Sequence, residues 1–209
     1  MTDQIDFLWT GPPRAANTLL LAHGAGAPMD TPFMSFFADG LAVKGVRVGR
    51  FEFAYMAERR LTGKRKPPNP AQALMNTWRT AINTCGADRV VIGGKSMGGR
   101  IASMVADEMG VAGLICLGFP FYGAGRRDKP RIAHLETLKT RTLICQGERD
   151  KLGDRATVEA LKLSKAISLH WAADGDHDLK PRKASGRTHA QNFNDALDAV
   201  AGFLAALPS

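Results

Sequence analysis

Apolar runs of strand length alternate along this chain with amphipathic segments of helix length. The strand candidates are TLLLAH (18–23), VRVGRFEF (46–53), RVVIGG (89–94), GLICLGF (113–119), RTLICQG (141–147) and ISLHWA (167–172). Runs this apolar are typical of strands that are buried on both faces of a sheet. The alternation therefore predicts a three-layer α/β fold, in which a mostly parallel sheet carries helices on both faces.

The segments between these runs have the apolar spacing of helices. They are FMSFFADGLAVKG (33–45), PAQALMNTWRTAINT (70–84), the stretch after Ser96, DRATVEALKLS (154–164) and THAQNFNDALDAVAGFLAAL (188–207). An early segment, IDFLWTG (5–11), predicts an antiparallel edge strand. The length of 209 residues predicts a single domain over 1–209. Because parallel strands point the same way, the loops that follow them meet at one carboxyl edge, where we expect the site.

The stretch VVIGGKSMGGR (90–100) contains two overlapping motifs. A phosphate-binding loop, G-x-x-x-x-G-K-[ST], would need its first glycine at position 89, which is Arg89, and its flexible loop where an apolar strand is predicted. A G-x-S-x-G nucleophile elbow needs a strand, a tight turn and a helix, with small residues two positions either side of the serine. Gly94 and Gly98 meet that need, so the elbow with Ser96 as nucleophile is the better interpretation.

A serine nucleophile of this kind needs an acid and a histidine later in the chain, in that order. Asp150 follows RTLICQG in the stretch QGERD, and His177 follows ISLHWA in the stretch DGDHD. Both residues fall on the predicted carboxyl edge. Glu148 and Asp154 are alternatives for the acid, although Asp150 better fits a short loop after the strand.

The other histidines fit a catalytic role less well. His170 lies within a predicted strand, His189 near the start of the last helix and His134 in a helical or turn stretch. Packed or solvated side chains are expected at such positions. The two acids that flank the predicted catalytic histidine, Asp176 and Asp178, are expected to cap the turn or to face solvent.

An acyl-transfer site also needs hydrogen-bond donors for the oxyanion that forms on the substrate. The small-residue loop in LLLAHGAGAPMD (19–30) follows the first parallel strand, where this arrangement supplies one backbone N–H. We expect that donor to be the N–H of Ala25, and the second to be the N–H of Met97, directly after the nucleophile. His23 would then orient the loop rather than act as a base.

These motifs give the chain a family resemblance over nearly its whole length. From LLLAHGAGA through GGKSMGGR and QGERD to DGDHDLKP it resembles the α/β-hydrolases. Within them it is similar to small, lidless bacterial proteins related to testis-expressed protein 30 and to the hydrolase-like domain of subunit 3 of the NSL chromatin complex. The motifs GGKSMGGR, HGAGA, LICLGFP and DGDHDLKP carry the closer likeness. The resemblance implies the fold and the triad more than the substrate, and its chromatin-associated members imply a scaffold role as an alternative.

Together the motifs predict a serine hydrolase of the carboxylesterase or thioesterase kind, with no large cap domain. The segment from about Pro120 to Leu135, where this fold often inserts a cap, is too short for one. The site should therefore be open and take a small ester or thioester through an acyl-enzyme. No metal and no organic cofactor is expected, and dienelactone-hydrolase-like enzymes are the expected relatives.

The net charge of +8 favours anionic partners. Basic residues concentrate in ERRLTGKRK (58–66), GRRDKPR (125–131) and LKPRKASGR (179–187), each of which follows a predicted strand. We expect a positive rim near Ser96 that attracts an anionic substrate, with Lys95, Arg126, Arg127 and Lys180 as candidates. The alternative is a weakly active or inert protein that docks an anionic partner through the same rim.

The remaining sequence features concern the cellular compartment of the protein and its partners. The N-terminal stretch lacks the pattern of a secretory signal, and the longest apolar run, VAGLICLGFPF (111–121), is too short to cross a membrane. We expect a cytoplasmic protein with three free, packed cysteines and no membrane partner. No nucleic-acid-binding motif is present, so nucleic acid is not an expected partner. The sequence is compatible with a monomer or a homodimer.

Overall fold

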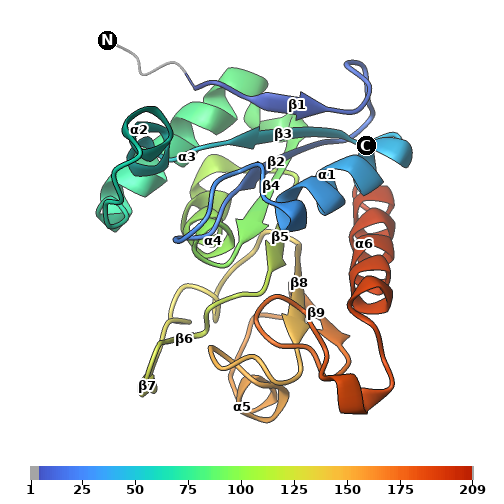
Figure 1. Ribbon diagram of the computed structural model, residues 1–209. Coiled ribbons are helices and arrows are strands. Elements are labelled where there is room, and N and C mark those ends of the chain that lie inside the picture. The colour runs from blue at the N-terminus through green and yellow to red at the C-terminus, as the bar shows by residue number, and fades with distance from the viewer. Residues whose placement is uncertain (1–4, 209) are drawn as a thin grey trace.

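A seven-stranded sheet forms the centre of the molecule in the computed structural model, which describes residues 5–208. The strands, in spatial order across the sheet, are β1 (Leu8–Thr10), β3 (Arg47–Phe51), β2 (Thr18–Ala22), β4 (Val90–Lys95), β5 (Gly113–Leu117), β8 (Thr142–Gly147) and β9 (Ile167–Ala172) (Figure 1). Only β1 runs antiparallel, against β3. The predicted strands are thus present, including the antiparallel edge strand near the N-terminus.

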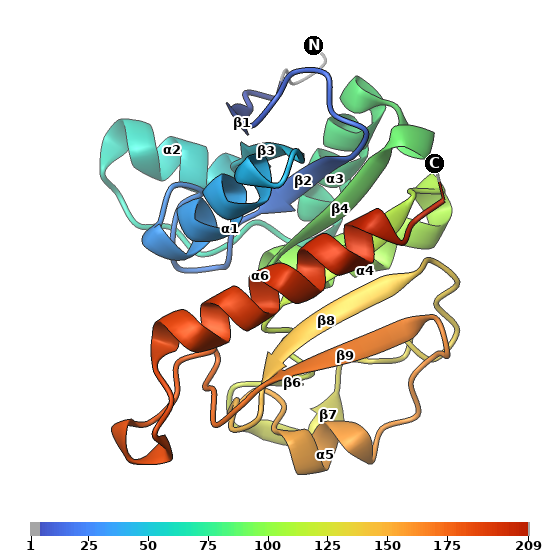
Figure 2. The ribbon, with the colours of Figure 1, turned by 90° about the vertical axis from the view of Figure 1, so that its right-hand side faces the viewer.

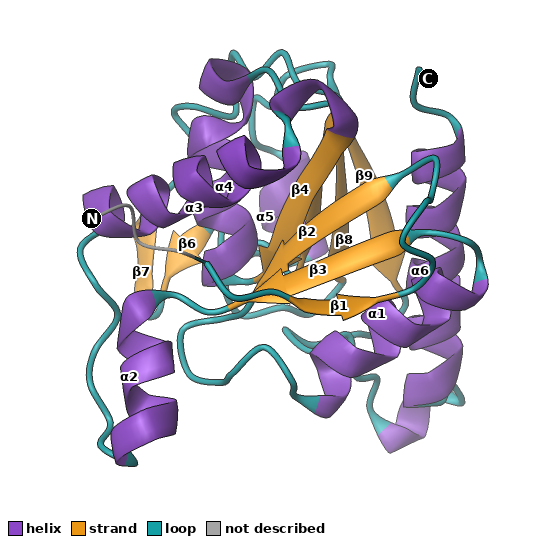
Figure 3. Ribbon diagram, turned by 90° about the horizontal axis from the view of Figure 1, so that it is seen from above, coloured by secondary structure: helices purple, strands orange, loops and turns teal. Residues whose placement is uncertain are grey.

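Helices cover both faces of this sheet. One face carries α1 (Pro32–Val43) and α6 (His189–Ala205), and the other carries α3 (Ala71–Cys85) and α4 (Met97–Met109). The views in Figures 2 and 3 show the sheet between these two layers. Each face has its own buried apolar cluster, built from alternate strand residues such as Leu19 on one side and Leu20 on the other. The predicted three-layer α/β fold is confirmed.

Shorter elements surround the carboxyl edge. They are α2 (Ala54–Thr62), α5 (Arg155–Glu159), the hairpin of β6 (Tyr122–Gly123) with β7 (Arg126–Pro130), and a 3₁₀ turn at Lys183–Ser185. A second 3₁₀ turn, at Ala87–Arg89, directly precedes β4 at the opposite edge of the sheet. The hairpin occupies the stretch between β5 and β8, and no separate lid domain lies there. Within residues 5–208, no helix combines the length and apolar character needed to span a membrane.

Two elements differ from the sequence prediction. Helix α2 was not among the predicted helices; Arg59 and Arg60 lie in its last turn, where their charges interact favourably with the helix dipole. Helix α5 ends at Glu159 instead of continuing to residue 164. The sheet register is what matters for the site, because Ala22 pairs with Gly94 and Gly147 pairs with Ala172. The loops after β2, β4, β8 and β9 therefore open at one edge.

Candidate active site

Ser96 occupies the sharp turn between β4 and α4. Its backbone has φ 51° and ψ −115°, a strained conformation for a residue with a side chain, and its N–H donates to the carbonyl of Leu117 at 3.0 Å. A Cβ atom at Gly94 or at Gly98 would lie 2.3 Å or 2.4 Å from the carbonyl oxygen of Ala22. Glycine is therefore required at both positions for the turn to pack this closely against β2.

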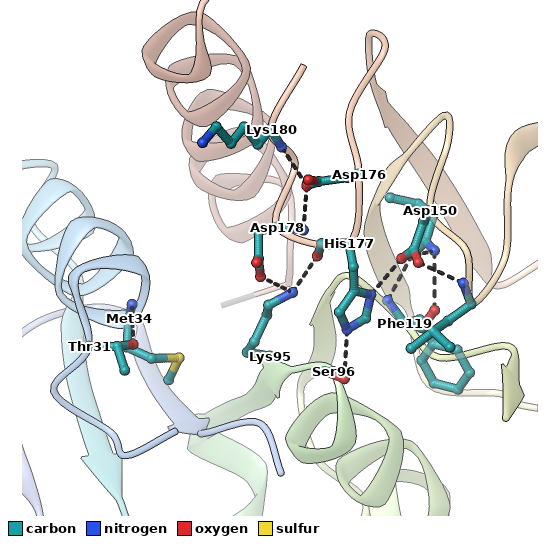
Figure 4. A network of polar contacts seen from close by, with 12 residues as sticks. Thr31, Met34, Lys95, Ser96, Phe119, Asp150, Asp176, His177, Asp178 and Lys180 are labelled. Carbon is teal, nitrogen blue, oxygen red and sulfur yellow. Dashed lines mark hydrogen bonds and ion pairs between the residues drawn. The ribbon is translucent and has the colours of Figure 1, made fainter. Parts of the chain in front are cut away.

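Three side chains from three loops form a continuous hydrogen-bond chain (Figure 4). The Nε2 atom of His177 lies 2.8 Å from Oγ of Ser96, and its Nδ1 atom lies 2.7 Å from Oδ2 of Asp150. Since an ionised carboxylate only accepts hydrogen bonds, Nδ1 carries the proton of a neutral imidazole and Nε2 accepts from the serine hydroxyl. This is the arrangement that general-base activation of a serine requires.

Asp150 is fully buried and held by further donors. Its Oδ1 atom accepts from the N–H of Leu152 at 2.8 Å, and its Oδ2 atom accepts from Nε2 of Gln146, also at 2.8 Å. The fully buried Gln146 is itself fixed by both backbone groups of Phe119 and by the carbonyl of Gly153. Gln146 therefore orients the carboxylate toward His177, a role that the sequence did not indicate because glutamine in a strand carries no motif.

The alternative acids have other partners. Glu148 forms an ion pair with Arg155 at 2.9 Å, and Asp154 caps the N-terminus of α5 by accepting from the N–H of Thr157 at 3.0 Å. Among the alternative histidines, His134 contacts Ser103 through Nε2 at 2.8 Å. None of these hydrogen bonds reaches the three-residue chain.

The loop after β2 is fixed by a second histidine. His23 is fully buried; its Nδ1–H donates to the carbonyl of Gly24 at 2.7 Å and its Nε2 accepts from the N–H of Phe53 at 3.1 Å. Burial lowers its pKa, so the neutral ring that this pattern needs is favoured. The hydroxyl of Tyr55 donates to the carbonyl of Ala25 at 2.9 Å. These contacts hold Ala25 beside Ser96, where the first oxyanion donor was predicted.

Comparison of the sequence with known protein families identifies the family of this chain. A sequence model of the α/β-hydrolase domain matches residues 15–205, which is most of the chain. The chain belongs to the α/β-hydrolase family.

Solved structures of other hydrolases share the fold over nearly the whole length of both chains. A lidless α/β serine hydrolase from Xanthomonas campestris is 21% identical, with a TM-score of 0.66 over 98% of this chain and 91% of that one. A dienelactone hydrolase from Anabaena variabilis is 20% identical, with a TM-score of 0.73 over 96% and 91%. An α/β serine hydrolase homologue from Coxiella burnetii is 18% identical, with a TM-score of 0.65 over 98% and 96%. The closer likeness to testis-expressed protein 30 and to the NSL subunit stays a prediction.

In this member of the α/β-hydrolase family, Ser96 lies between two hollows with different linings. The first has a volume of about 610 Å³ and is bordered mainly by apolar side chains, among them Phe33, Met34 and Phe193, together with His177. The second has a volume of about 470 Å³ and is lined by Ala25, Pro68, Asn69, Ala71, Leu74, Met97, Arg100, Ile101, Pro120, Tyr122, Ala124, Arg131 and Leu152. The two predicted oxyanion residues, Ala25 and Met97, thus border the second hollow together with Ser96.

Lys95 occupies a different position from the one expected of a rim residue. Its side chain is only 11% exposed, and Nζ donates to the carbonyl of His177 and forms a 3.0 Å ion pair with Asp178 (Figure 4). Burial lowers the pKa of Lys95, and the charge of Asp178 opposes that shift. The ammonium group thus ties the turn at Ser96 to the histidine loop, and Lys95 also borders the first hollow.

The other rim candidates lie outside both hollows. Arg127 forms an ion pair with Asp154 at 2.7 Å, and Arg126 lies 3.5 Å from Asp128. Lys180 is exposed, and its backbone N–H donates to Asp176, which caps the turn as predicted. None of the three side chains borders the hollows beside the nucleophile. The basic segment GRRDKPR therefore contains one arginine that borders the second hollow, Arg131, whereas Arg100, which also borders it, lies in no predicted basic segment.

Proposed function

We propose that this protein is a serine hydrolase that cleaves small esters or thioesters through an acyl-enzyme. His177 takes the proton of the Ser96 hydroxyl as the oxygen attacks the substrate carbonyl carbon. Asp150 keeps the imidazole in the required tautomer and stabilises its cation. The N–H groups of Ala25 and Met97 donate to the oxyanion of the tetrahedral intermediate.

Collapse of that intermediate breaks the bond to the leaving group, and His177 returns the proton to the departing oxygen or sulfur. Water then attacks the acyl carbon with the same histidine as base, which releases the acid and restores Ser96. The continuous hydrogen-bond chain from the serine through the histidine to the buried aspartate is the observation that carries this proposal.

The substrate class follows from the shape of the site. Within residues 5–208 no lid domain covers the serine, and the two hollows are of modest volume, about 610 and 470 Å³. Such hollows suit short acyl and alcohol groups better than a long lipid chain. A small molecule is therefore the proposed partner.

A panel of short-chain esters and thioesters tests the proposal. We expect the wild-type protein to hydrolyse 4-nitrophenyl acetate and butanoate, or the matching acyl thioesters, at a rate that depends on enzyme concentration. The Ser96→Ala variant should lose this activity by a factor on the order of 10⁶ and retain the fold. Equal rates in both proteins would refute Ser96 as the nucleophile.

A further inference from the structure

Two arginines border the second hollow without a carboxylate partner. Arg100 lies on α4 one turn after the nucleophile, and its N–H donates to the carbonyl of Ser96 at 3.0 Å. Arg131 directly follows β7, and a Cβ atom added to Gly123 would lie 2.8 Å from its guanidinium. Within residues 5–208 neither guanidinium forms an ion pair, whereas the neighbouring Arg127 pairs with Asp154.

Burial makes the lack of a partner costly at Arg100. Its Nε atom is buried and has no hydrogen-bond partner in the described part of the chain. Burial, and then the nearby charge of Arg131, lower the pKa of Arg100, and no carboxylate is present to offset them. Although that Nε atom is covered, Arg100 as a whole is only half-buried and borders the second hollow, so its guanidinium charge lies beside any anion bound there.

The residues around these arginines reinforce the point. No aspartate or glutamate borders the second hollow, although the same hollow reaches Ser96 and Met97. We infer that the hollow between Arg100 and Arg131 binds a carboxylate carried by the substrate. Guanidinium groups suit this role because their donors match the two oxygens of a carboxylate.

The position of the histidine indicates which half of the substrate carries that charge. His177 must protonate the leaving oxygen, so the leaving group lies on the side of the serine that His177 borders. That side is the apolar hollow with Phe33 and Phe193. The acyl group therefore lies in the second hollow, beside Met97 and the two arginines.

This inference rests on the proposed function and names its substrate class: a monoester of a short dicarboxylic acid with an apolar alcohol. Water cleaves the acyl C–O bond, so that the products are the dicarboxylate, the free alcohol and, at neutral pH, one proton. The charged end of the acyl group remains bound by Arg100 and Arg131 throughout, and it takes no part in bond making.

A matched pair of esters tests the charge preference. Monobenzyl succinate and benzyl 4-oxopentanoate share the alcohol and the chain length, but the first ends in a carboxylate and the second in a neutral ketone. We expect the wild-type protein to favour the succinate ester at least about 10-fold in kcat/KM, because hydrogen bonds to charged groups are among the stronger ones. Monobenzyl glutarate and adipate then define the chain length that the hollow accepts.

Variants assign the preference to the two arginines. Arg131→Gln and Arg100→Gln should each lower kcat/KM for the succinate ester by about 10- to 100-fold, through KM, and change the ketone ester less than about 3-fold. Arg126→Gln is the control, because it removes the same charge from the same hairpin at a position outside the hollow. It should leave both esters unchanged.

The outcomes separate this inference from the proposed function. If the ketone ester is hydrolysed as well as the succinate ester, or if the arginine variants lower both equally, the carboxylate site is wrong and the hydrolase stands. A preference for 4-carboxybenzyl propanoate over benzyl propanoate would contradict the assignment of the charge to the acyl side. If the wild-type protein cleaves no ester, the proposed function fails.

Even if no ester is cleaved, a binding measurement still tests the carboxylate site. Calorimetric titration of Ser96→Ala with monobenzyl succinate should show binding at least about 10-fold weaker once Arg131→Gln is added. An absence of binding, or an affinity that Arg131→Gln leaves unchanged, would overturn the inference. Because Arg131 is exposed, its substitution should leave the melting temperature unchanged and keep the test independent of folding.

Discussion

Replacing Lys95 with methionine removes the contact between the nucleophile turn and the histidine loop. Methionine keeps an unbranched apolar stem of similar length, so the side chain can still pack near Phe33, whose ring centre lies 4.9 Å from Nζ in the wild-type protein. The variant loses the donor to the carbonyl of His177 and the charge beside Asp178. We expect kcat to fall while KM changes little, because the imidazole is no longer held at its distance from Ser96.

The size of the effect follows from the two contacts. A hydrogen bond from a charged group contributes about 1.5–3 kcal/mol. The side chain of Asp178 is 66% exposed, so solvent screens its ion pair and limits that contribution to less than about 1 kcal/mol. A loss of about 2–3 kcal/mol in positioning corresponds to a decrease of roughly 30- to 150-fold in kcat/KM.

Stability should change much less than activity. Burial disfavours the charged form of Lys95, as the lowered pKa indicates, so an apolar replacement removes a desolvation cost along with the two contacts. We therefore expect the melting temperature of Lys95→Met to stay within a few degrees of the wild-type value.

Steady-state hydrolysis of one neutral ester, with thermal unfolding in parallel, measures both quantities. Asp178→Asn is the matched control: it removes the exposed half of the ion pair but keeps the donor to the His177 carbonyl, and it should lower kcat less than about 5-fold. A Lys95→Met variant that keeps the wild-type kcat, or an equal loss of activity in both variants, would exclude this positioning role of Lys95.

Three other changes probe the rest of the site. Asp150→Asn should lower kcat on the order of 10⁴-fold with little change in melting temperature, because an amide that donates to Nδ1 stabilises the wrong tautomer of His177; unchanged kcat would exclude that role. Gly98→Ala places a methyl group 2.4 Å from the carbonyl oxygen of Ala22 and should cost about 1–3 kcal/mol in urea unfolding, and full stability would contradict the packing of the turn. Burial raises the pKa of Tyr55 to about 12 from an unfolded value of 10, so folding favours the protonated hydroxyl. Stability should therefore fall as pH rises between about 10 and 12, and Tyr55→Phe should flatten that part of the profile; an equally steep profile in the variant would rule this source out.

The fold and the three-residue chain could be predicted because both depend on local pattern and on strand order. Apolar runs such as RVVIGG read as buried strands, and the elbow places glycines two residues either side of Ser96. Once the sheet is parallel, Asp150 and His177 reach the same edge simply because each follows a strand. The structure brings the three side chains together in the predicted order along the chain.

Which basic side chains near Ser96 lack an ion-pair partner could not be predicted in this way. The sequence shows where the charges are, but not which acids neutralise them. Lys95 was expected to be a free charge, yet Asp178 and the His177 carbonyl occupy its donors. Arg127 is paired with Asp154, an acid 27 residues away at the N-terminus of α5. Arg100, which lies inside a predicted helix, and Arg131 border the hollow beside the serine without an ion-pair partner in the described part of the chain. Ion pairing is a tertiary property, and it decides which basic groups remain for a ligand.

Covalent labelling by a fluorophosphonate probe tests the catalytic role of Ser96 most directly. The probe should label the wild-type protein and leave Ser96→Ala unlabelled, and it should label His177→Ala far more slowly because the serine has lost its base. Equal labelling of the wild-type protein and Ser96→Ala, or no labelling of a folded wild-type protein, would contradict the account and favour an inert hydrolase-like protein that docks an anionic partner.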